Sequence, residues 1–231
     1  AGGAGMGALD LADADACRAA IALHQPDWVI NEGAYTAVDK AESEPELAHA
    51  VNAGAPAAFA EALRQQGGRM LQLSTDFVFS GSQGSPYRVE QPRDPLGVYG
   101  SSKAKGEEAV EAVFEGTDQS TILRTSWIIG PVGRNFALTM LRLHRDKDEL
   151  GVVADQLGCP SSTLNLATAC WSTLDQGPTS PVIHWCDAGA ASWYDVAVAV
   201  GRIGAELGLI DTPAEVQPIT TADYPTPAER P

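Results

Sequence analysis

The chain has 231 residues, of which 44% are hydrophobic, so it can bury one large core or the core of a domain with a smaller lobe. Its 30 acidic and 15 basic residues give a net charge of −15, which argues against nucleic-acid binding and against anionic membranes. No run approaches the ~18 apolar residues of a membrane helix, and the start does not resemble a secretory signal. We therefore expect a cytoplasmic protein with no nucleic-acid or membrane partner.

Neither the cysteines nor the histidines show the spacing of metal ligands, so we predict no metal site. The cysteines are Cys17, Cys159, Cys170 and Cys186. We expect them to be buried, reduced thiols. The histidines are His24, His49, His144 and His184. We expect these to lie on helix or sheet surfaces.

The first part of the chain alternates helical and extended patterns. Residues 13–25 (DADACRAAIALHQ) predict a helix with aspartates at its N-terminus, where they suit the helix dipole. Residues 27–34 (DWVINEGA) predict a buried strand that runs into a loop. Residues 44–66 are rich in alanine and predict a long helix, bent at Pro56.

The same alternation continues toward the middle of the chain. Residues 69–81 (RMLQLSTDFVFSG) predict a strand whose polar end begins at Ser74. A loop rich in Gly, Ser and Pro, residues 80–97, leads to a helix that begins with VYGSSKAKGE. Residues 120–130 (STILRTSWIIG) predict a further strand. Strands that alternate with helices imply right-handed crossovers and a parallel sheet of the doubly wound α/β class.

Polar segments follow three of the predicted strands: residues 31–42, 74–76 and 125–127. In parallel sheets of this kind, ligands gather beyond the C-terminal ends of the strands. From about residue 150 the pattern changes, and a smaller α/β lobe is expected, in which Ser192 caps a helix. Substrates commonly bind where such lobes meet.

Tyr99 and Lys103 are spaced so that a helix places them on one face. Chance alone gives this spacing in roughly one such chain in ten. A free phenol has a pKa near ~10, and a neighbouring ammonium favours the phenolate and lowers that pKa. The ammonium can also bond the ribose hydroxyls of a dinucleotide, and Thr75 is a candidate to bind a substrate oxygen. If a cofactor supplies hydride, neither a metal nor a covalent nucleophile is required.

Each of these residues also has a purely structural interpretation. Tyr99 can be a packing residue, and Thr75 and Asp76 can form a turn after the strand. Trp127 can belong to the core. The segment AVDKAESEPE, residues 37–46, can be a solvated acidic loop.

A set of longer segments decides between these interpretations. They are AYTAVDKAESEPE, VNA, STDFVFSG, VYGSSKAKGE, LRTSWIIG, NFALTMLRL, DQLGCPSS, WYDVA and YPTPAERP. In this order, and over nearly the whole chain, they resemble the dTDP-4-dehydrorhamnose reductase family of the extended short-chain dehydrogenase/reductase superfamily. TAVDKAE, RTSW and YPTPA are far more specific than Tyr-x-x-x-Lys.

The resemblance implies reduction of the 4-keto group of dTDP-4-dehydro-L-rhamnose by NADPH or NADH. The product is dTDP-L-rhamnose, and the reaction is the last step in making activated rhamnose for cell-surface polysaccharide. Thr75, Tyr99 and Lys103 match the catalytic trio of the family. Tyr99 would protonate the C4 oxygen, Lys103 would tune Tyr99 and hold the nicotinamide ribose, and Thr75 would bond the keto oxygen.

The resemblance also implies binding residues. The expected substrate contacts are Thr75, Asp76 and Trp127. The expected cofactor contacts are Asp10 and Leu11 on the adenine side, Ala34, Tyr35 and Thr36 after the first strand, and Tyr99 and Lys103. The family is associated with Mg²⁺, but no segment here identifies its ligands, and a homodimer stays open.

Two departures from the family matter. The family opens with a strand, a GxxGQxG turn and a helix that cradles the pyrophosphate, whereas this chain has only AGGAGMG at residues 1–7. We therefore expect about 30 residues, one β-α-β unit, to be missing at the front, and a final segment to be missing after YPTPAERP. The expected organisation is a partial NAD(P)-binding Rossmann domain at 1–150, interleaved with an incomplete substrate lobe at 151–231. Such a fragment would lack the pyrophosphate cradle and could be inactive.

The second departure is Glu32, which stands where the family usually has a small apolar residue. A carboxylate near an anionic cofactor costs affinity unless it points into solvent or pairs with a cation.

Two other functions share these motifs. Nucleotide-sugar dehydratases and epimerases share the fold and Tyr-x-x-x-Lys, but dehydratases place an acidic residue directly after Thr-Asp, where this chain has Phe77. A non-catalytic regulatory subunit of the methionine adenosyltransferase type is also similar, and the intact Thr75, Tyr99 and Lys103 favour an enzyme over it.

Overall fold

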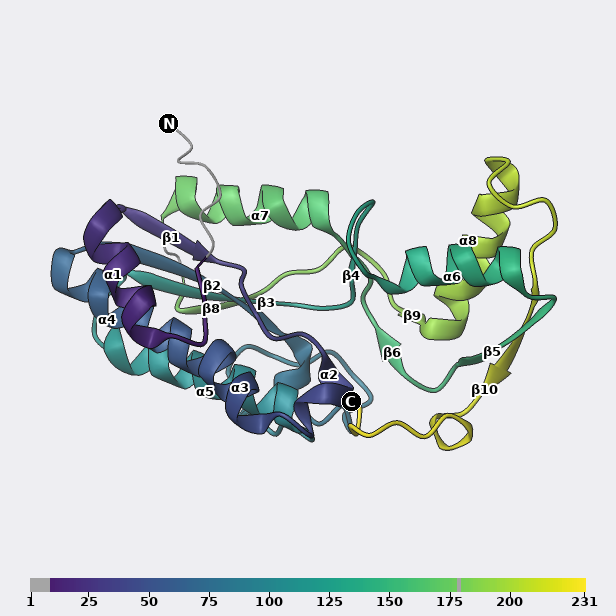
Figure 1. Ribbon diagram of the computed structural model, residues 1–231, viewed down its shortest axis with the longest axis horizontal. Helices are drawn as coiled ribbons and strands as arrows, with labels where there is room; N and C mark the ends of the chain where they lie inside the picture. The colour runs from purple at the N-terminus through teal and green to yellow at the C-terminus, as the bar shows by residue number, and fades with distance from the viewer. Residues whose placement is uncertain (1–8, 178–179) are drawn as a thin grey trace. The chain divides into compact units, whose positions relative to one another are not determined.

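The computed structural model describes residues 9–177 and 180–231, and its contacts divide the chain into two compact units (Figure 1). Unit 1 comprises the described residues of segments 1–124, 172–184 and 227–231, and unit 2 comprises 125–171 and 185–226. The glycine-rich segment at residues 1–7 lies outside the described residues. The domain roles assigned on either side of residue 150 stay predictions.

Helices and strands alternate along the chain, as the sequence predicts. The helices are α1 (Ala14–His24), α2 (Val38–Ala41), α3 (Pro45–His49), α4 (Ala55–Gln66), α5 (Val98–Val113), α6 (Phe136–Asp146), α7 (Thr163–Gln176) and α8 (Trp193–Glu206), with the π-helical segment η1 (Ala50–Gly54) and the 3-10 turns η2 (Asp76–Val78) and η3 (Thr221–Asp223). The strands are β1 (Trp28–Asn31), β2 (Arg69–Thr75), β3 (Ser120–Thr125), β4 (Ile128–Ile129), β5 (Glu149–Val153), β6 (Leu157–Gly158), β7 (Ser161–Ser162), β8 (Val182–His184), β9 (Ala191–Ser192) and β10 (Glu215–Ile219). Among the described residues, no helix combines the length and the apolar character needed to cross a membrane.

Unit 1 is built on a four-stranded sheet in the order β1-β2-β3-β8. β1 pairs in parallel with β2, with Asn31 opposite Gln72, and β3 pairs in parallel with β8, with Ile122 opposite Val182. The helical segments between β1 and β2 and between β2 and β3 are the crossovers that such pairing needs. The predicted α/β fold with a parallel sheet is therefore confirmed.

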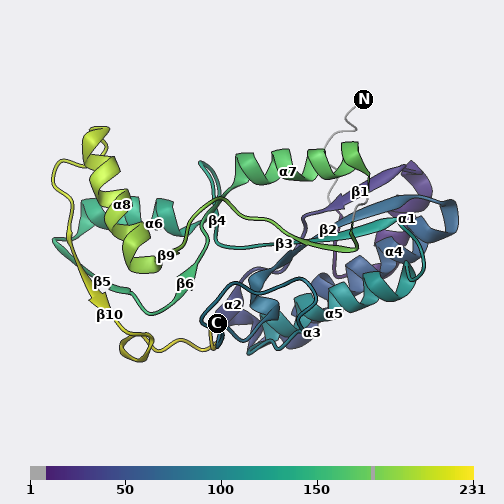
Figure 2. The same cartoon turned by 180° about the vertical axis from the view of Figure 1, so that it is seen from behind.

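Helices α1, α4 and α5 lie on one side of this sheet in both views (Figure 1, Figure 2). Their apolar residues form the main core, which consists of Cys17, Ile21, Ala55, Ala58, Phe59, Ala60, Leu63, Met70, Val110, Phe114 and Ile122. The aspartates predicted at the start of α1 are in place, because the Asp13 carboxylate accepts the backbone N–H groups of Asp15 and Ala16, each at 3.0 Å.

The long helix predicted over residues 44–66 is interrupted before Pro56 by the π-helical segment η1. This segment turns Asn52 inward, where it is 1% exposed. The Asn52 amide accepts the backbone N–H of Tyr35 at 2.8 Å, and donates to the Tyr35 carbonyl at 3.0 Å and to the Ser102 hydroxyl of α5 at 2.9 Å. The π-helical turn thus links the loop after β1 to helix α5, in keeping with the frequent use of such turns at functional sites.

Unit 2 is built on a parallel pair of strands, β5 and β10, and on helices α6 and α8. Its core consists of Met140, Leu150, Val152, Ala197 and Ala214. The predicted cap of α8 is confirmed and extends to a full capping box. The Ser192 hydroxyl accepts the Asp195 N–H at 3.0 Å, and the Asp195 carboxylate accepts the Ser192 N–H at 2.8 Å.

Two expectations about single residues are wrong. The cysteines are not all buried as expected: Cys17 and Cys170 are buried, but Cys159 is partly exposed and Cys186 is exposed on the segment after β8. His144 is 1% exposed instead of lying on a helix surface, because its ring fills the space between α6 and α8 and its Nε2 lies 2.9 Å from the Ala197 carbonyl oxygen. The helical periodicity of the sequence could not reveal the Ala197 carbonyl as a partner of His144, because the two lie on different helices.

The contact between α5 and η1 yields a stability prediction. At Gly106 of α5, a Cβ atom would collide with the backbone carbonyl of Asn52, and rigid backbone cannot yield as a side chain can. We expect Gly106→Ala to destabilise the protein by about 1–3 kcal/mol, measured by urea unfolding. Gly54→Ala is the matched control, because Gly54 is helical and its Cβ would meet only the His49 carbonyl, at 3.9 Å. If Gly106→Ala and Gly54→Ala were equally stable, the close approach of α5 to η1 at Gly106 would be contradicted.

Candidate active site

The C-terminal edge of the sheet in unit 1 carries two of the predicted polar segments. β1 ends at Asn31 and β2 at Thr75, and because the two strands are parallel, residues 31–36 and 74–76 follow the same edge. The third segment, residues 125–127, belongs to unit 2.

Thr75 and Asp76 form the turn at the end of β2. The Thr75 hydroxyl accepts the Phe77 N–H at 3.2 Å and donates to the Asp76 carboxylate at 3.0 Å. Burial raises the pKa of Asp76 to about 6, although its hydrogen bonds with Thr75 and with the backbone act in the opposite direction. The turn predicted as the structural interpretation is therefore present, and it also fixes two polar groups at the edge of the sheet.

Tyr99, in the first turn of α5, is brought to this turn. Its hydroxyl lies close enough to that of Thr75 to interact with it, and its ring packs edge-on against Phe77 with centroids 5.4 Å apart. Burial, together with the Asp76 charge, raises the pKa of Tyr99 to about 12. This direction is opposite to the lowering that we expected from Lys103, because burial outweighs any ammonium effect here.

Lys103 lies one helical turn after Tyr99 and is 5% exposed. Its Nζ donates to the backbone carbonyl of Leu73 on β2 at 2.7 Å. Burial lowers the pKa of Lys103 to about 8, and the charge of Glu107 opposes that shift. The structure thus brings Thr75, Tyr99 and Lys103 to one end of β2, as the motif predicts.

The first turn of α5 is held from a distant segment. At Gly100 a Cβ atom would collide with the Phe77 carbonyl, so a glycine is needed for α5 to approach η2 this closely. The N-cap residue of α5 is Gly97, which has no side chain that could cap the helix. The Glu42 carboxylate accepts the Val98 N–H instead, at 2.8 Å. A carboxylate at a helix N-terminus is favourable for both its charge and its hydrogen bond.

The C-terminal segment, residues 227–231, returns to the same place in unit 1. Arg230 donates to the Asp39 carboxylate at 2.7 Å, and the Ala228 N–H donates to it at 3.2 Å. Arg230 therefore holds the pKa of Asp39 below its usual range. Residues 37–46 are therefore more than a solvated loop: they include α2, and Asp39 and Glu42 attach the C-terminal segment and the first turn of α5 to it.

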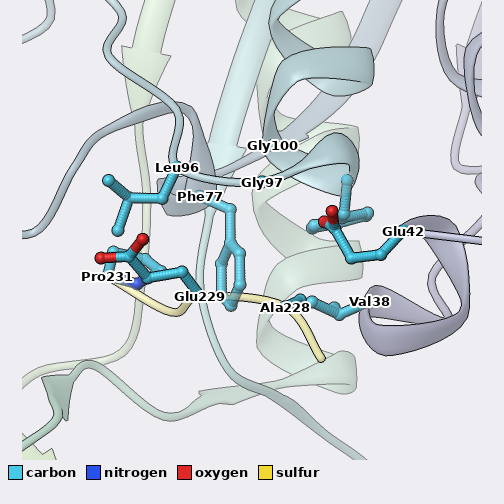
Figure 3. A pocket seen from close by; sticks show the side chains of 10 residues that line it. Val38, Glu42, Phe77, Leu96, Gly97, Gly100, Ala228, Glu229 and Pro231 are labelled. Atoms are coloured by element: carbon cyan, nitrogen blue, oxygen red, sulfur yellow. The ribbon is translucent and has the colours of Figure 1, made fainter. Parts of the chain in front are cut away.

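A pocket lies beside the trio, and Tyr99 is one of its lining residues. The other residues that line it are Val38, Glu42, Phe77, Leu96, Gly97, Gly100, Ala228, Glu229 and Pro231. Figure 3 shows the Phe77 side chain in the middle of this group, between Leu96 and Pro231 on one side and Val38 and Glu42 on the other.

The residues expected near a cofactor lie in two adjacent loops of unit 1. Asp10 and Leu11 precede α1, and the Leu11 side chain lies against Gly33 in the loop after β1. Ala34, Tyr35 and Thr36 follow in that loop, and Asn52 holds both backbone groups of Tyr35.

Glu32 and Trp127 are two further residues that the sequence singles out. Glu32 is exposed, so its carboxylate is solvated, which is one of the two conditions under which it is tolerated beside an anion. Trp127 belongs to unit 2, where it has a left-handed φ of 46° and stacks on Trp193 at a centroid distance of 3.5 Å. Strained backbone of this kind is common at functional sites. No cluster of acidic, histidine or cysteine side chains that could hold a metal ion occurs among the described residues.

Sequence reasoning missed Glu42, Asp39 and Asn52 as residues that position the site. One signal could have found Glu42. A helix that starts after glycine, with no Ser, Thr, Asp or Asn at the cap, needs a hydrogen-bond acceptor from elsewhere in the chain.

A parallel sheet with a tyrosine, a lysine and a threonine at the C-terminal end of one strand defines a Rossmann-like α/β protein of the short-chain dehydrogenase/reductase class. The family model described as "RmlD substrate binding domain" matches residues 3–231. A dTDP-4-dehydrorhamnose reductase of Streptomyces griseus is 43% identical over 232 residues, covering 98% of this chain and 74% of that protein. The chain belongs to the dTDP-4-dehydrorhamnose reductase family.

Solved structures agree with this membership. The chain aligns with the crystal structure of a dTDP-4-dehydrorhamnose reductase from Clostridium acetobutylicum with a TM-score of 0.88 and 37% identity, over 96% of this chain and 76% of that one. It aligns with the Bacillus anthracis reductase in complex with NADP with a TM-score of 0.87 and 30% identity, over the same shares of 96% and 76%.

The raised pKa of Asp76 predicts a stability effect. Because this pKa of about 6 lies above that of a free aspartate, the fold disfavours the carboxylate, and stability falls as the pH rises from about 4 to about 6 and stays lower above that range. We expect Asp76→Asn to melt at a higher temperature than the unchanged protein at about pH 8, with the difference vanishing near pH 4. The exposed Asp118→Asn is the control. If Asp76→Asn melted at a lower temperature than the unchanged protein at about pH 8, the conclusion that burial of the Asp76 carboxylate destabilises the fold would be wrong.

Proposed function

We propose that this protein is a dTDP-4-dehydrorhamnose reductase, which reduces the 4-keto group of dTDP-4-dehydro-L-rhamnose to give dTDP-L-rhamnose, the last step of activated rhamnose synthesis. The observation that carries the proposal is the arrangement of Thr75, Tyr99 and Lys103 at the end of β2, in a chain of this family. A cytoplasmic location and a homodimer stay predictions.

The residues of unit 1 suit the nicotinamide end of a dinucleotide, NADPH or NADH. A lysine ammonium has three N–H donors, and the one hydrogen bond of Lys103 described within the chain goes to the Leu73 carbonyl, so two buried donors remain for ribose hydroxyls. The complex of the Bacillus anthracis relative with NADP supports a cofactor of this class and favours NADPH. The chemistry that this cofactor supplies when bound is hydride donation. Mg²⁺ has no role in the proposal.

The chain's own residues handle the proton. At neutral pH the raised pKa of Tyr99 keeps its phenol protonated, so the phenol can donate to the C4 oxygen, which becomes a strongly basic alkoxide during reduction. The Thr75 hydroxyl, which lies beside that of Tyr99, is placed to bond the same oxygen. The Lys103 cation stabilises the phenolate that is left after proton transfer. Asp76 and Trp127 are proposed to bind hydroxyls and the ring face of the sugar.

The alternative functions are less well supported. A dehydratase needs an acid where this chain has Phe77, and the Phe77 ring packs on Tyr99 without any group that can transfer a proton. A non-catalytic subunit of the methionine adenosyltransferase type has no need of Tyr99 and Thr75 hydroxyls that lie side by side.

Removal of one hydroxyl tests the acid role. We expect Tyr99→Phe to lower the turnover of dTDP-4-dehydro-L-rhamnose by about 10²–10⁴-fold, because general acid catalysis contributes that much, while binding of NADPH changes little. Turnover is measured by NADPH oxidation and binding by fluorescence titration. Tyr224→Phe, at a tyrosine that is 61% exposed, is the matched control. Unchanged turnover in Tyr99→Phe would favour the non-catalytic alternative.

The two buried charges predict a bell-shaped pH dependence of turnover. Activity should rise with pH as Asp76 ionises near pH 6, and fall as Lys103 loses its proton near pH 8. In Lys103→Arg the cation persists at all working pH values, so the fall near pH 8 should disappear even though overall activity is lower. A fall near pH 8 that persists in Lys103→Arg would assign it to another group.

A further inference from the structure

One buried carboxylate of unit 1 has no place in the catalytic trio. Glu107 lies one helical turn after Lys103 on α5 and is almost fully buried, at 1% exposure. Burying a carboxylate that has no partners costs a large free energy of folding. The groups around Glu107 therefore indicate what role its charge has.

Two guanidinium groups from two other elements hold Glu107. Arg124 of β3 donates from Nε at 2.9 Å and from Nη2 at 2.6 Å, and Arg93, in the loop that precedes α5, donates from Nε at 2.6 Å. Arg93 also donates to Glu111 at 2.7 Å, and Arg124 lies 3.2 Å from Nε2 of His184 on β8. The cluster therefore ties this loop, α5, β3 and β8 together.

Lys103 lies next to this cluster on the same face of α5. Residues four apart on a helix have Cβ atoms about 5–6 Å apart, and both of these side chains are buried. The groups described around the Lys103 ammonium are the Leu73 carbonyl on β2 and the Glu107 carboxylate on α5. Of the charged side chains, Glu107 is the one that raises the pKa of Lys103, against the lowering caused by burial.

We propose that Glu107 is a positioning residue for Lys103: its carboxylate, fixed by Arg93 and Arg124, keeps the Lys103 ammonium charged inside the core of unit 1. The two arginines set the strength of this effect, because each of them neutralises part of the carboxylate charge that Lys103 experiences. The loop that carries Arg93 thereby acts on the charge of Lys103 without touching it.

The consequence for catalysis rests on the proposed function. If Lys103 must be charged to hold ribose and to stabilise a phenolate, then Glu107 extends the working pH range of the reductase upward. The upper limb of the pH profile should move to lower pH when Glu107 loses its charge. The charge of Lys103 itself can be measured whether or not the protein is a reductase.

The test is a titration of the lysine side chains by NMR. The chain has only four lysines, Lys40, Lys103, Lys105 and Lys147, so protein labelled with ¹³C at the lysine Cε gives few signals. The Lys103 signal is identified by its loss in Lys103→Arg. We expect its titration midpoint to fall by about one pH unit or more in Glu107→Gln.

Glu111→Gln is the matched control. It removes a carboxylate from the same helix and the same arginine, but its side chain is 36% exposed and lies two turns from Lys103, so the midpoint should not move. A merely structural role of Glu107 would lower the melting temperature and leave the Lys103 midpoint in place. That result, or an equal shift in Glu111→Gln, would overturn the proposal.

A second variant covers the case in which Glu107→Gln does not fold. Arg93 is partly exposed, and Arg93→Gln removes one cation that masks Glu107. The Lys103 midpoint should then rise, which is opposite in sign to the effect of Glu107→Gln and is not expected from general loosening of the fold. An unchanged or lowered midpoint in Arg93→Gln would also overturn the proposal. A shifted midpoint combined with absence of reductase activity would retain the proposal and reject the proposed function.

Discussion

The seating of α5 against β2 is the constraint on which the site depends. The Lys103 ammonium donates to the Leu73 carbonyl at 2.7 Å, two residues before Thr75, so the helix that carries Tyr99 is fixed to the strand that carries its hydroxyl partner. Small residues let α5 approach the neighbouring turns as well, since Gly100 meets the Phe77 carbonyl of η2 and Gly106 meets the Asn52 carbonyl of η1. Burial then sets the chemistry, because it raises the pKa of Tyr99 and lowers that of Lys103.

Other segments of unit 1 hold α5 and the loops beside it in position. Glu42 supplies the cap that Gly97 lacks, and Asp39 binds the returning C-terminal segment through Arg230. Asn52, turned inward by a π-helical segment, joins the loop after β1 to α5. Segments far apart in the sequence thus determine where one phenol hydroxyl lies.

The sequence predicted the parallel sheet, the caps of α1 and α8 and the placement of Thr75, Tyr99 and Lys103, because these follow from periodicity and local spacing. It did not predict the direction of the Tyr99 pKa shift, because that depends on burial by distant elements. The inward turn of Asn52 and the burial of His144 were missed for the same reason: each depends on a tertiary partner, Ser102 and the Ala197 carbonyl respectively.

Transfer of an isotope tests the central claim most directly. The protein is mixed with dTDP-4-dehydro-L-rhamnose and NADPH deuterated at the transferring position, and the product sugar is analysed by NMR and mass spectrometry. The account predicts one deuterium at C4 of rhamnose for each NADPH consumed, with the hydroxyl proton derived from solvent through Tyr99. Formation of product without net NADPH consumption, or without deuterium at C4, would contradict it.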